Sequence, residues 1–264
     1  MWLKRVMCAA LLLLVSCGEP VPSTGDARIL LLGDSMFATN QNTERAVANV
    51  IEAELGEEVI DRSVIGARYF YKLPLTGAAG LNLPMQYRKG AWDWVVINGG
   101  GNDLLFGCGC GFCDGVLNRL VSKDGRAGAI PSLVAMIRKT GAKVVYSGYM
   151  RNPGTTTPIK GCGPAGNELD RRLTLMAQFD KGVTFVPMAN LVPYGDRSYH
   201  QIDGIHPTAK ASLGIGKRLA AVIAADKGRA ALRKPDQKAP ATRKADARTS
   251  MQKPPAPQKS VPKP

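Results

Sequence analysis

The stretch Ile29-Leu30-Leu31-Leu32-Gly33-Asp34-Ser35 contains the signal that decides the fold. Its apolar run stops abruptly at Gly-Asp-Ser, a pattern that predicts a buried strand ending in a tight turn. In open α/β sheets, ligands bind beyond the carboxyl ends of the strands. Ser35 is therefore a candidate nucleophile, provided that the chain also supplies a base, a group that orients the base, and donors for an oxyanion.

The rest of the chain alternates strand-like and helix-like segments in the way that a parallel sheet with helices on both faces requires. We predict a three-layer α/β/α sandwich of the flavodoxin-like class with a central, mostly parallel five-stranded sheet. Right-handed crossovers would bring all the strand ends to one edge. The further predicted strands are 58–64, 94–98, 143–147 and 183–186, and the predicted helices are 43–55, 130–140, 168–179 and 208–225.

Three later blocks carry polar groups or glycines at predicted strand ends or in the last loop. Gly66 closes Ser63-Val64-Ile65-Gly66, and Asn102 lies in Gly99-Gly100-Gly101-Asn102-Asp103, directly after an apolar run. Asp203 precedes His206 by one turn in Asp203-Gly204-Ile205-His206, which suits a bond from the carboxylate to the imidazole Nδ1–H. These groups could supply the oxyanion donors and the base.

Taken in this order, the four blocks resemble those of the SGNH (GDSL-type) hydrolase family, over roughly residues 28–225. The resemblance implies that Ser35 is the nucleophile, His206 the base and Asp203 the carboxylate that orients it. It also implies an oxyanion hole formed by the N–H of Ser35, the N–H of Gly66 and the side chain of Asn102. The implied activity is ester hydrolysis, which requires neither a metal nor an organic cofactor.

The sequence departs from the family pattern at two places; the first is at a tolerant position, and the second leaves the substrate pocket open. Met36 stands where the family name implies leucine, and a cysteine-rich insertion follows Asn102. Carboxylesters, lipids and carbohydrate O-acetyl esters are candidates, with lysophospholipids or thioesters as an alternative under the same mechanism. A non-catalytic, envelope-binding lipoprotein is a further alternative. The second histidine, His200, lies in a polar loop, and we expect it to border the site.

The amino terminus reads as an export signal. Two basic residues precede a short apolar run that is too short to span a membrane as a helix. Residues 14–17 resemble a bacterial lipobox, with Cys17 as the lipidated residue; an ordinary cleaved signal is the alternative. We therefore expect a signal peptide over 1–17, a tether over 18–27, and an exported protein that is periplasmic or anchored to the membrane. Secretion in soluble form is the alternative.

Four cysteines remain beyond the signal region, an even number that in an exported protein predicts two disulfides with three possible pairings. Zinc binding is the weaker alternative, because an oxidising compartment disfavours four free thiolates. Crosslinks here would stiffen the loop after Asn102 and form one wall of the site. The candidates are Cys108, Cys110, Cys113 and Cys162.

The net charge of +14 belongs mainly to the carboxyl-terminal end. Residues 227–264 contain eleven basic residues against two aspartates, a surplus of nine, and lack apolar periodicity. We predict a hydrolase domain over 28–226 and a disordered tail over 227–264. The tail could bind anionic envelope polymer. Nucleic acid is not an expected partner, because the tail has no interleaved aromatic residues.

Overall fold

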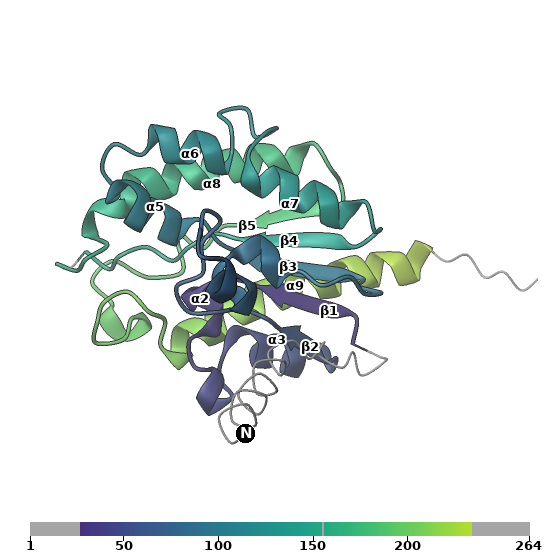
Figure 1. The fold of residues 1–264 in the computed structure, drawn as a ribbon. Coiled ribbons are helices and arrows are strands. Elements are labelled where there is room, and N and C mark those ends of the chain that lie inside the picture. The colour runs from purple at the N-terminus through teal and green to yellow at the C-terminus, as the bar shows by residue number, and fades with distance from the viewer. Residues whose placement is uncertain (1–26, 155, 234–264) are drawn as a thin grey trace, which may run out of the picture.

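The computed structural model describes residues 27–154 and 156–233 and contains one five-stranded sheet in the order β2-β1-β3-β4-β5 (Figure 1). Every strand pair in this sheet is parallel, and Leu31 of β1 lies opposite Val96 of β3. The strands are β1 (Ile29–Leu32), β2 (Val59–Asp61), β3 (Trp94–Asn98), β4 (Lys143–Ser147) and β5 (Val183–Val186). The predicted fold class is confirmed.

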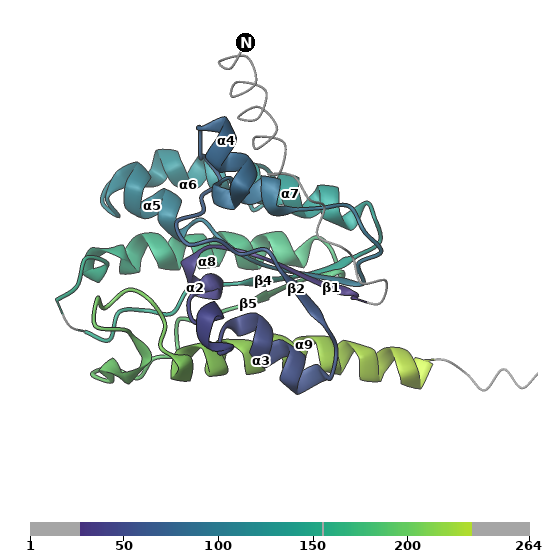
Figure 2. The ribbon, with the colours of Figure 1, turned by 60° about the horizontal axis from the view of Figure 1, so that its bottom comes forward.

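The helices cover both faces of the sheet, as Figure 2 shows. Helices α5 (Gly101–Cys108), α6 (Asp114–Leu120), α7 (Ala129–Arg138) and α8 (Gly163–Gln178) cover one face, and α3 (Val47–Leu55) and α9 (Ala209–Arg233) cover the other. The shorter elements are α2 (Ser35–Ala38), η1 (Gln41–Thr43), α4 (Pro74–Thr76), η2 (Gly77–Leu81), η3 (Leu83–Gln86), η4 (Lys160–Cys162) and η5 (Arg197–Tyr199).

Alternation along β1 divides the interior into two cores. Leu30 and Leu32 face the α5–α8 layer, whereas Ile29 and Leu31 face α3 and α9, and all four are fully buried. Successive residues of a strand point to opposite faces, so a strand buried on both sides must be apolar throughout. The continuous apolar run in the sequence is the direct consequence.

Several predicted boundaries were wrong. Helix α3 begins at Val47 rather than at residue 43, and Thr43 belongs to η1. Strand β2 is shorter than predicted, and α8 begins at Gly163 rather than near residue 168. Helices α5 and α6 were not predicted, because the glycines and cysteines in and between them interrupt the helical spacing of apolar residues. The predicted end of this helix α3 at residue 55 is correct, since Gly56 follows it with a left-handed φ of 64°.

The carboxyl-terminal helix is longer than predicted, because α9 continues through residues 227–233, which we had assigned to the tail. The predicted signal peptide with Cys17, nearly all of the tether and residues 234–264 of the tail lie outside the described residues. Among the helices that the structure describes, none combines the length and the apolar character that crossing a bilayer requires.

Candidate active site

The turn after β1 places Ser35 at the first position of α2, where the backbone N–H groups point away from the helix. Buried Gln86 holds this turn from the side: the N–H of Gly33 donates to its Oε1 at 2.8 Å, and its Nε2 donates to the Gly33 carbonyl at 2.9 Å. Asp34 caps α2 by accepting the Met36 N–H at 2.9 Å. The backbone around Ser35 is thus fixed by one side chain of the turn itself and by one from another segment.

Asp34 also connects this turn to the end of β4. Its second carboxylate oxygen accepts the hydroxyl of Tyr149 at 2.5 Å, and the same hydroxyl accepts the N–H of Gly101 at 2.9 Å. Burial raises the pKa of Asp34 to about 6, although the hydrogen bonds from Tyr149 and Met36 lower it in part. The chain of bonds from Gly101 through Tyr149 to Asp34 joins the loop after β3 to the turn that carries Ser35.

The raised pKa of Asp34 predicts a pH dependence of stability. Between about pH 4 and pH 6 the unfolded chain releases this proton while the native state keeps it, so the group destabilises the native protein increasingly as pH rises. Compared with Asp34→Asn, the wild type should lose roughly 2 kcal/mol of unfolding free energy between pH 4 and pH 7.5. Urea denaturation at both pH values measures this; parallel pH profiles for the two proteins would contradict it.

Asn102 enters the site from the start of α5. Gly100 precedes the helix with a φ of 101°, and a Cβ on Gly101 would lie 2.6 Å from the Tyr149 ring, so both positions require glycine. The Asn102 Nδ2 donates to the carbonyl of Ala67 at 3.1 Å. Because an amide nitrogen carries two hydrogens, this bond orients Asn102 and leaves a second donor for a ligand.

Asp103 joins the loop after β2 to the same helix. Its carboxylate accepts the N–H groups of Tyr69 and Phe70, each at 2.9 Å. Burial raises the pKa of Asp103 despite these bonds. Gly66 precedes this segment and has a φ of 82°. The loop after β2 is therefore tied to α5 by two consecutive side chains, Asn102 and Asp103.

The loop before α9 pairs His206 with Asp203. The imidazole Nδ1 lies 2.6 Å from the Asp203 Oδ2, and the Oδ1 accepts the N–H groups of Ile205 and His206 at 2.9 and 3.0 Å. Burial alone would raise the pKa of Asp203, but the bonds from His206 and the backbone hold it below its usual value. The carboxylate is thus charged at neutral pH and accepts the Nδ1 proton, so the Nε2 of neutral His206 is left without one.

A cavity of about 510 Å³ brings Ser35, Asn102 and His206 together. Asp203 lies behind His206, and Gly66 is not among the residues that line the cavity. His200 does not border it as expected: this side chain is buried, and neither ring nitrogen has a hydrogen-bond partner among the described residues. The apolar lining comes from Met36, Leu104, Leu105, Met150, Ile159, Leu169 and Ile205.

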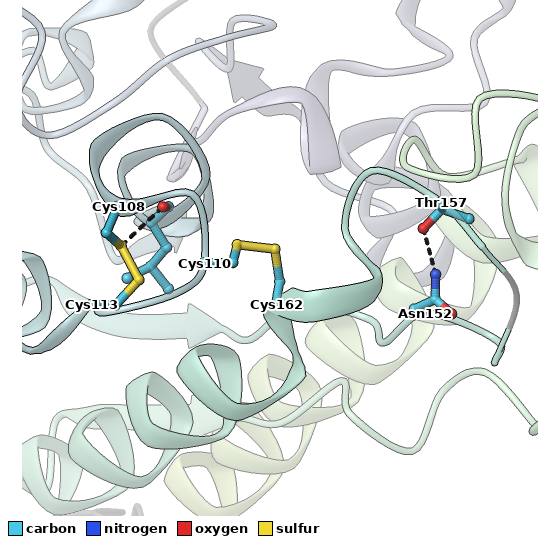
Figure 3. Close-up of a disulfide and its surroundings, with 7 residues drawn as sticks. Cys108, Cys110, Cys113, Asn152, Thr157 and Cys162 are labelled. Carbon is cyan, nitrogen blue, oxygen red and sulfur yellow. Dashed lines mark hydrogen bonds between the residues drawn. A yellow bond between two sulfur atoms is a disulfide. The ribbon is translucent and has the colours of Figure 1, made fainter.

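Two disulfides form next to this cavity, which confirms the expectation of crosslinks and removes the zinc alternative (Figure 3). Cys108 pairs with Cys113 within the turn after α5, and Cys110 pairs with Cys162 at the start of α8. Cys110 and Cys162 both line the cavity. The second crosslink therefore holds two chain segments that form one wall.

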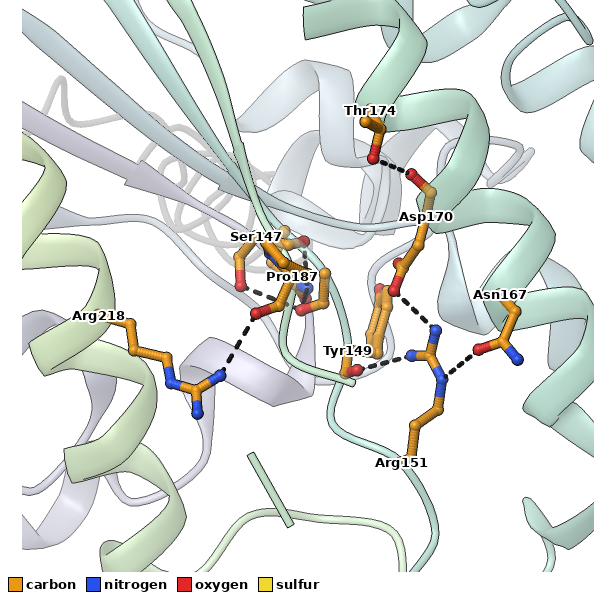
Figure 4. Close-up of polar contacts among 10 residues, drawn as sticks. Ser147, Tyr149, Arg151, Asn167, Asp170, Thr174, Pro187 and Arg218 are labelled. Carbon is orange, nitrogen blue, oxygen red and sulfur yellow. Dashed lines mark hydrogen bonds and ion pairs between the residues drawn. The ribbon is translucent and has the colours of Figure 1, made fainter. Parts of the chain in front are cut away.

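Arg151 fixes the opposite end of that wall (Figure 4). Its guanidinium donates to the Tyr149 carbonyl at 2.7 Å, to Asn167 Oδ1 at 3.0 Å and to Asp170 Oδ2 at 2.7 Å. The Arg151–Asp170 pair is mostly buried, so these bonds are poorly screened by solvent. The segment after β4 is thereby joined to α8 by an ion pair, whereas the Cys110–Cys162 disulfide joins the turn after α5 to the start of α8.

Sequence reasoning missed Tyr149 and Gln86. Tyr149 carried a usable signal, because it follows a predicted strand at the carboxyl edge, where ligand-binding residues gather. Gln86 carried none, since it lies in the long connection between β2 and β3 and reaches Gly33 only through the tertiary fold.

Parallel strands in the order 2-1-3-4-5 define a doubly wound α/β protein of the flavodoxin-like class, and the polar groups after β1 and β3 lie at the point where the strand order reverses. The GDSL-like Lipase/Acylhydrolase family matches residues 31–212, and the chain belongs to this family. It is therefore a hydrolase that acts on ester bonds. Comparison with curated proteins gives no match.

Solved structures support the same fold. Est24, a carbohydrate acetylesterase from Sinorhizobium meliloti, is 18% identical with a TM-score of 0.53 and covers 75% of this chain and 99% of its own. TesA is 22% identical with a TM-score of 0.51 over 74% of this chain and 97% of its own. The lipase Lip_vut3 from a goat rumen metagenome is 18% identical with a TM-score of 0.50, and the match covers 74% of this chain and 96% of the lipase. At these identities the likeness concerns the fold.

Proposed function

We propose that this protein is a serine ester hydrolase in which Ser35 attacks the ester carbonyl. His206 accepts the Ser35 proton, and Asp203 stabilises the imidazolium that forms. His206 then protonates the leaving alcohol, and water repeats the cycle to release the acid. The observation that carries the proposal is the 2.6 Å contact between His206 Nδ1 and Asp203 Oδ2, made by a histidine that lines the same cavity as Ser35.

We assign the oxyanion hole to the Ser35 N–H, the Gly66 N–H and the Asn102 side chain. The bond from Asn102 to the Ala67 carbonyl supports its part, because a donor held in advance needs no reorganisation during the reaction. Gly66 has weaker support, since it is not among the residues that line the cavity.

Asn102→Ala should lower kcat by about 10²–10³, because the transition state loses one donor. The Michaelis constant should change little, since a neutral ester carbonyl binds the donor more weakly than the oxyanion does. Asn167→Ala provides a matched control: this asparagine lines the same cavity but bonds to Arg151. A similar fall in both variants, measured with a nitrophenyl ester, would contradict the assignment of Asn102.

The substrate that we favour is a carboxylester with an apolar acyl group. The cavity lining supports it, because leucine, isoleucine and methionine side chains surround the space beside Ser35. Acetylated carbohydrate is the second candidate, and the fold that the chain shares with the Est24 acetylesterase favours it. Lysophospholipids and thioesters fit the same chemistry.

A series of nitrophenyl esters from acetyl to decanoyl discriminates between these substrates. We expect kcat/KM to rise with chain length as the acyl group fills the apolar cavity. A maximum at acetyl would instead support the carbohydrate candidate. A fluorophosphonate probe tests for catalysis itself: failure to label the full chain would support a non-catalytic, envelope-binding lipoprotein.

We also propose that the protein is exported, with Cys17 as the site of lipid attachment. The two disulfides are compatible with an oxidising compartment. Metabolic labelling with a fatty acid in the wild type and in Cys17→Ser tests the attachment. Deletion of residues 234–264 tests the tail: if envelope retention is unchanged, the tail does not bind envelope polymer.

A further inference from the structure

The connection between β2 and β3 combines basic and apolar residues in a way that the proposed chemistry does not use. Residues 62–93 contain five basic residues and a single acidic one, Asp93 at the end of the connection, which pairs with Arg28; the chain as a whole has 21 acidic residues. This connection forms α4, η2 and η3. In Figure 2, α4 stands beyond the helix layer that contains α5.

Large apolar side chains of this connection face the solvent. Leu75 is 87% exposed and Leu73 is 64% exposed, and both flank the helix-starting Pro74. Phe106 of α5 is 65% exposed and joins them through Arg68, whose guanidinium lies 5.3 Å from the Tyr71 ring centre and 5.4 Å from that of Phe106. We call Arg68, Tyr71, Lys72, Leu73, Leu75 and Phe106 the insert patch.

The charges of the insert patch are of one sign. Lys72 is exposed next to Leu73, and Arg68 contacts aromatic rings. Among the described residues, the ion pairs lie elsewhere, as in Arg138–Asp180 and Arg151–Asp170. Arg68 also interacts with the buried carboxylate of Asp103, but no carboxylate is exposed among the patch residues. An apolar surface whose exposed charge is cationic is complementary to an anionic lipid surface.

The insert patch is rigidly connected to the cavity. Asp103 accepts the N–H groups of Tyr69 and Phe70, directly before Tyr71. Leu105 lines the cavity, and the next residue of α5, Phe106, belongs to the patch. A surface bound at the patch would therefore hold the mouth of the cavity at a fixed distance.

We propose that the insert patch docks on an anionic phospholipid bilayer, with Leu73 and Leu75 inserted among the acyl chains. Tyr71 suits the boundary between headgroups and acyl chains, and Arg68 and Lys72 suit the phosphate groups. This docking is separate from lipid attachment at Cys17, and it does not depend on which residue is the nucleophile. A protein partner for the patch is the competing outcome of the test.

The test places a fluorescent probe on the patch of the full chain. Leu75→Trp is mixed with phosphatidylglycerol–phosphatidylcholine vesicles whose acyl chains carry bromine, which quenches tryptophan only in direct contact. Leu213→Trp is the matched control, because Leu213 is also exposed but belongs to α9 on the opposite face of the sheet. After subtraction of the wild-type signal, we expect at least a twofold quenching of the probe at position 75 and none at position 213. Equal quenching at both positions, or none at position 75, would overturn the proposal.

A second measurement separates docking from misfolding and from the basic tail. Leu73→Ser combined with Leu75→Ser should weaken binding to the anionic vesicles about tenfold, while hydrolysis of a soluble short-chain ester stays at the wild-type rate. Leu213→Ser should leave both unchanged. Vesicles of phosphatidylcholine alone should bind the wild type at least tenfold more weakly. If the double variant binds as the wild type does, the patch is not the lipid-binding surface, and a protein partner becomes the better explanation.

Discussion

Ser35→Ala should abolish ester hydrolysis and lower kcat by about 10⁴–10⁶. The hydroxyl is the only group at this position that can form the acyl-enzyme, and the remaining rate comes from the oxyanion donors and from binding alone. Phe37 and Met36 keep α2 packed in the core, so the fold should not change. Initial rates with nitrophenyl acetate and labelling by a fluorophosphonate measure the loss.

Ser132→Ala is the matched control for this experiment. Ser132 is exposed on α7, and its hydroxyl donates only to the Gly128 carbonyl of the preceding turn. The control should keep the wild-type rate and the wild-type labelling. If Ser35→Ala keeps a rate within tenfold of the wild type, Ser35 is not the nucleophile, and another residue of the cavity must carry the chemistry.

Asp203→Asn should lower kcat by about 10⁴. The new side chain can still accept the N–H groups of Ile205 and His206 through its oxygen, so the loop should keep its shape. Its amide nitrogen would then face the His206 Nδ1 as a donor and favour the tautomer with hydrogen on Nε2. That tautomer cannot accept the Ser35 proton.

Asp196→Asn provides the same chemical change at a related turn. Asp196 caps η5 by accepting the Ser198 N–H, and it pairs with Lys210 rather than with His206. The Asp196→Asn variant should hydrolyse esters at the wild-type rate over the neutral pH range. A small effect of Asp203→Asn, within tenfold, would mean that His206 is oriented by its backbone surroundings rather than by the carboxylate.

Local sequence predicts most of the strands correctly but not all of the helices. β3, β4 and β5 were predicted with the bounds that the structure gives, because each is a short apolar run between polar segments. Helices α5 and α6 were missed for the opposite reason. The glycine-rich and cysteine-rich sequence there has no clear helical period, and its helices depend on burial of Leu104, Leu117 and Leu120 and on the crosslinks.

The residues of the site also fall into two groups, those that the local sequence predicts and those that only the tertiary fold brings together. Gly33-Asp34-Ser35 and the Asp203–His206 turn are local motifs, since capping and a carboxylate three residues before an imidazole are set by neighbours in sequence. The role of Tyr149 is not local. Its hydroxyl joins Asp34 and Gly101 only because β1, β3 and β4 lie side by side in the sheet.

The sequence by itself determined the parallel α/β class, the edge at which the site forms, and the candidate residues Ser35, Asn102, Asp203 and His206. Periodicity and turn chemistry act over a few residues, so they can be read without coordinates. The tertiary structure alone decided the pairing of Cys110 with Cys162, the burial of His200 and the support of the Ser35 turn by Gln86 and Tyr149. These features join segments far apart in the chain, and packing of the layers determines which of them meet.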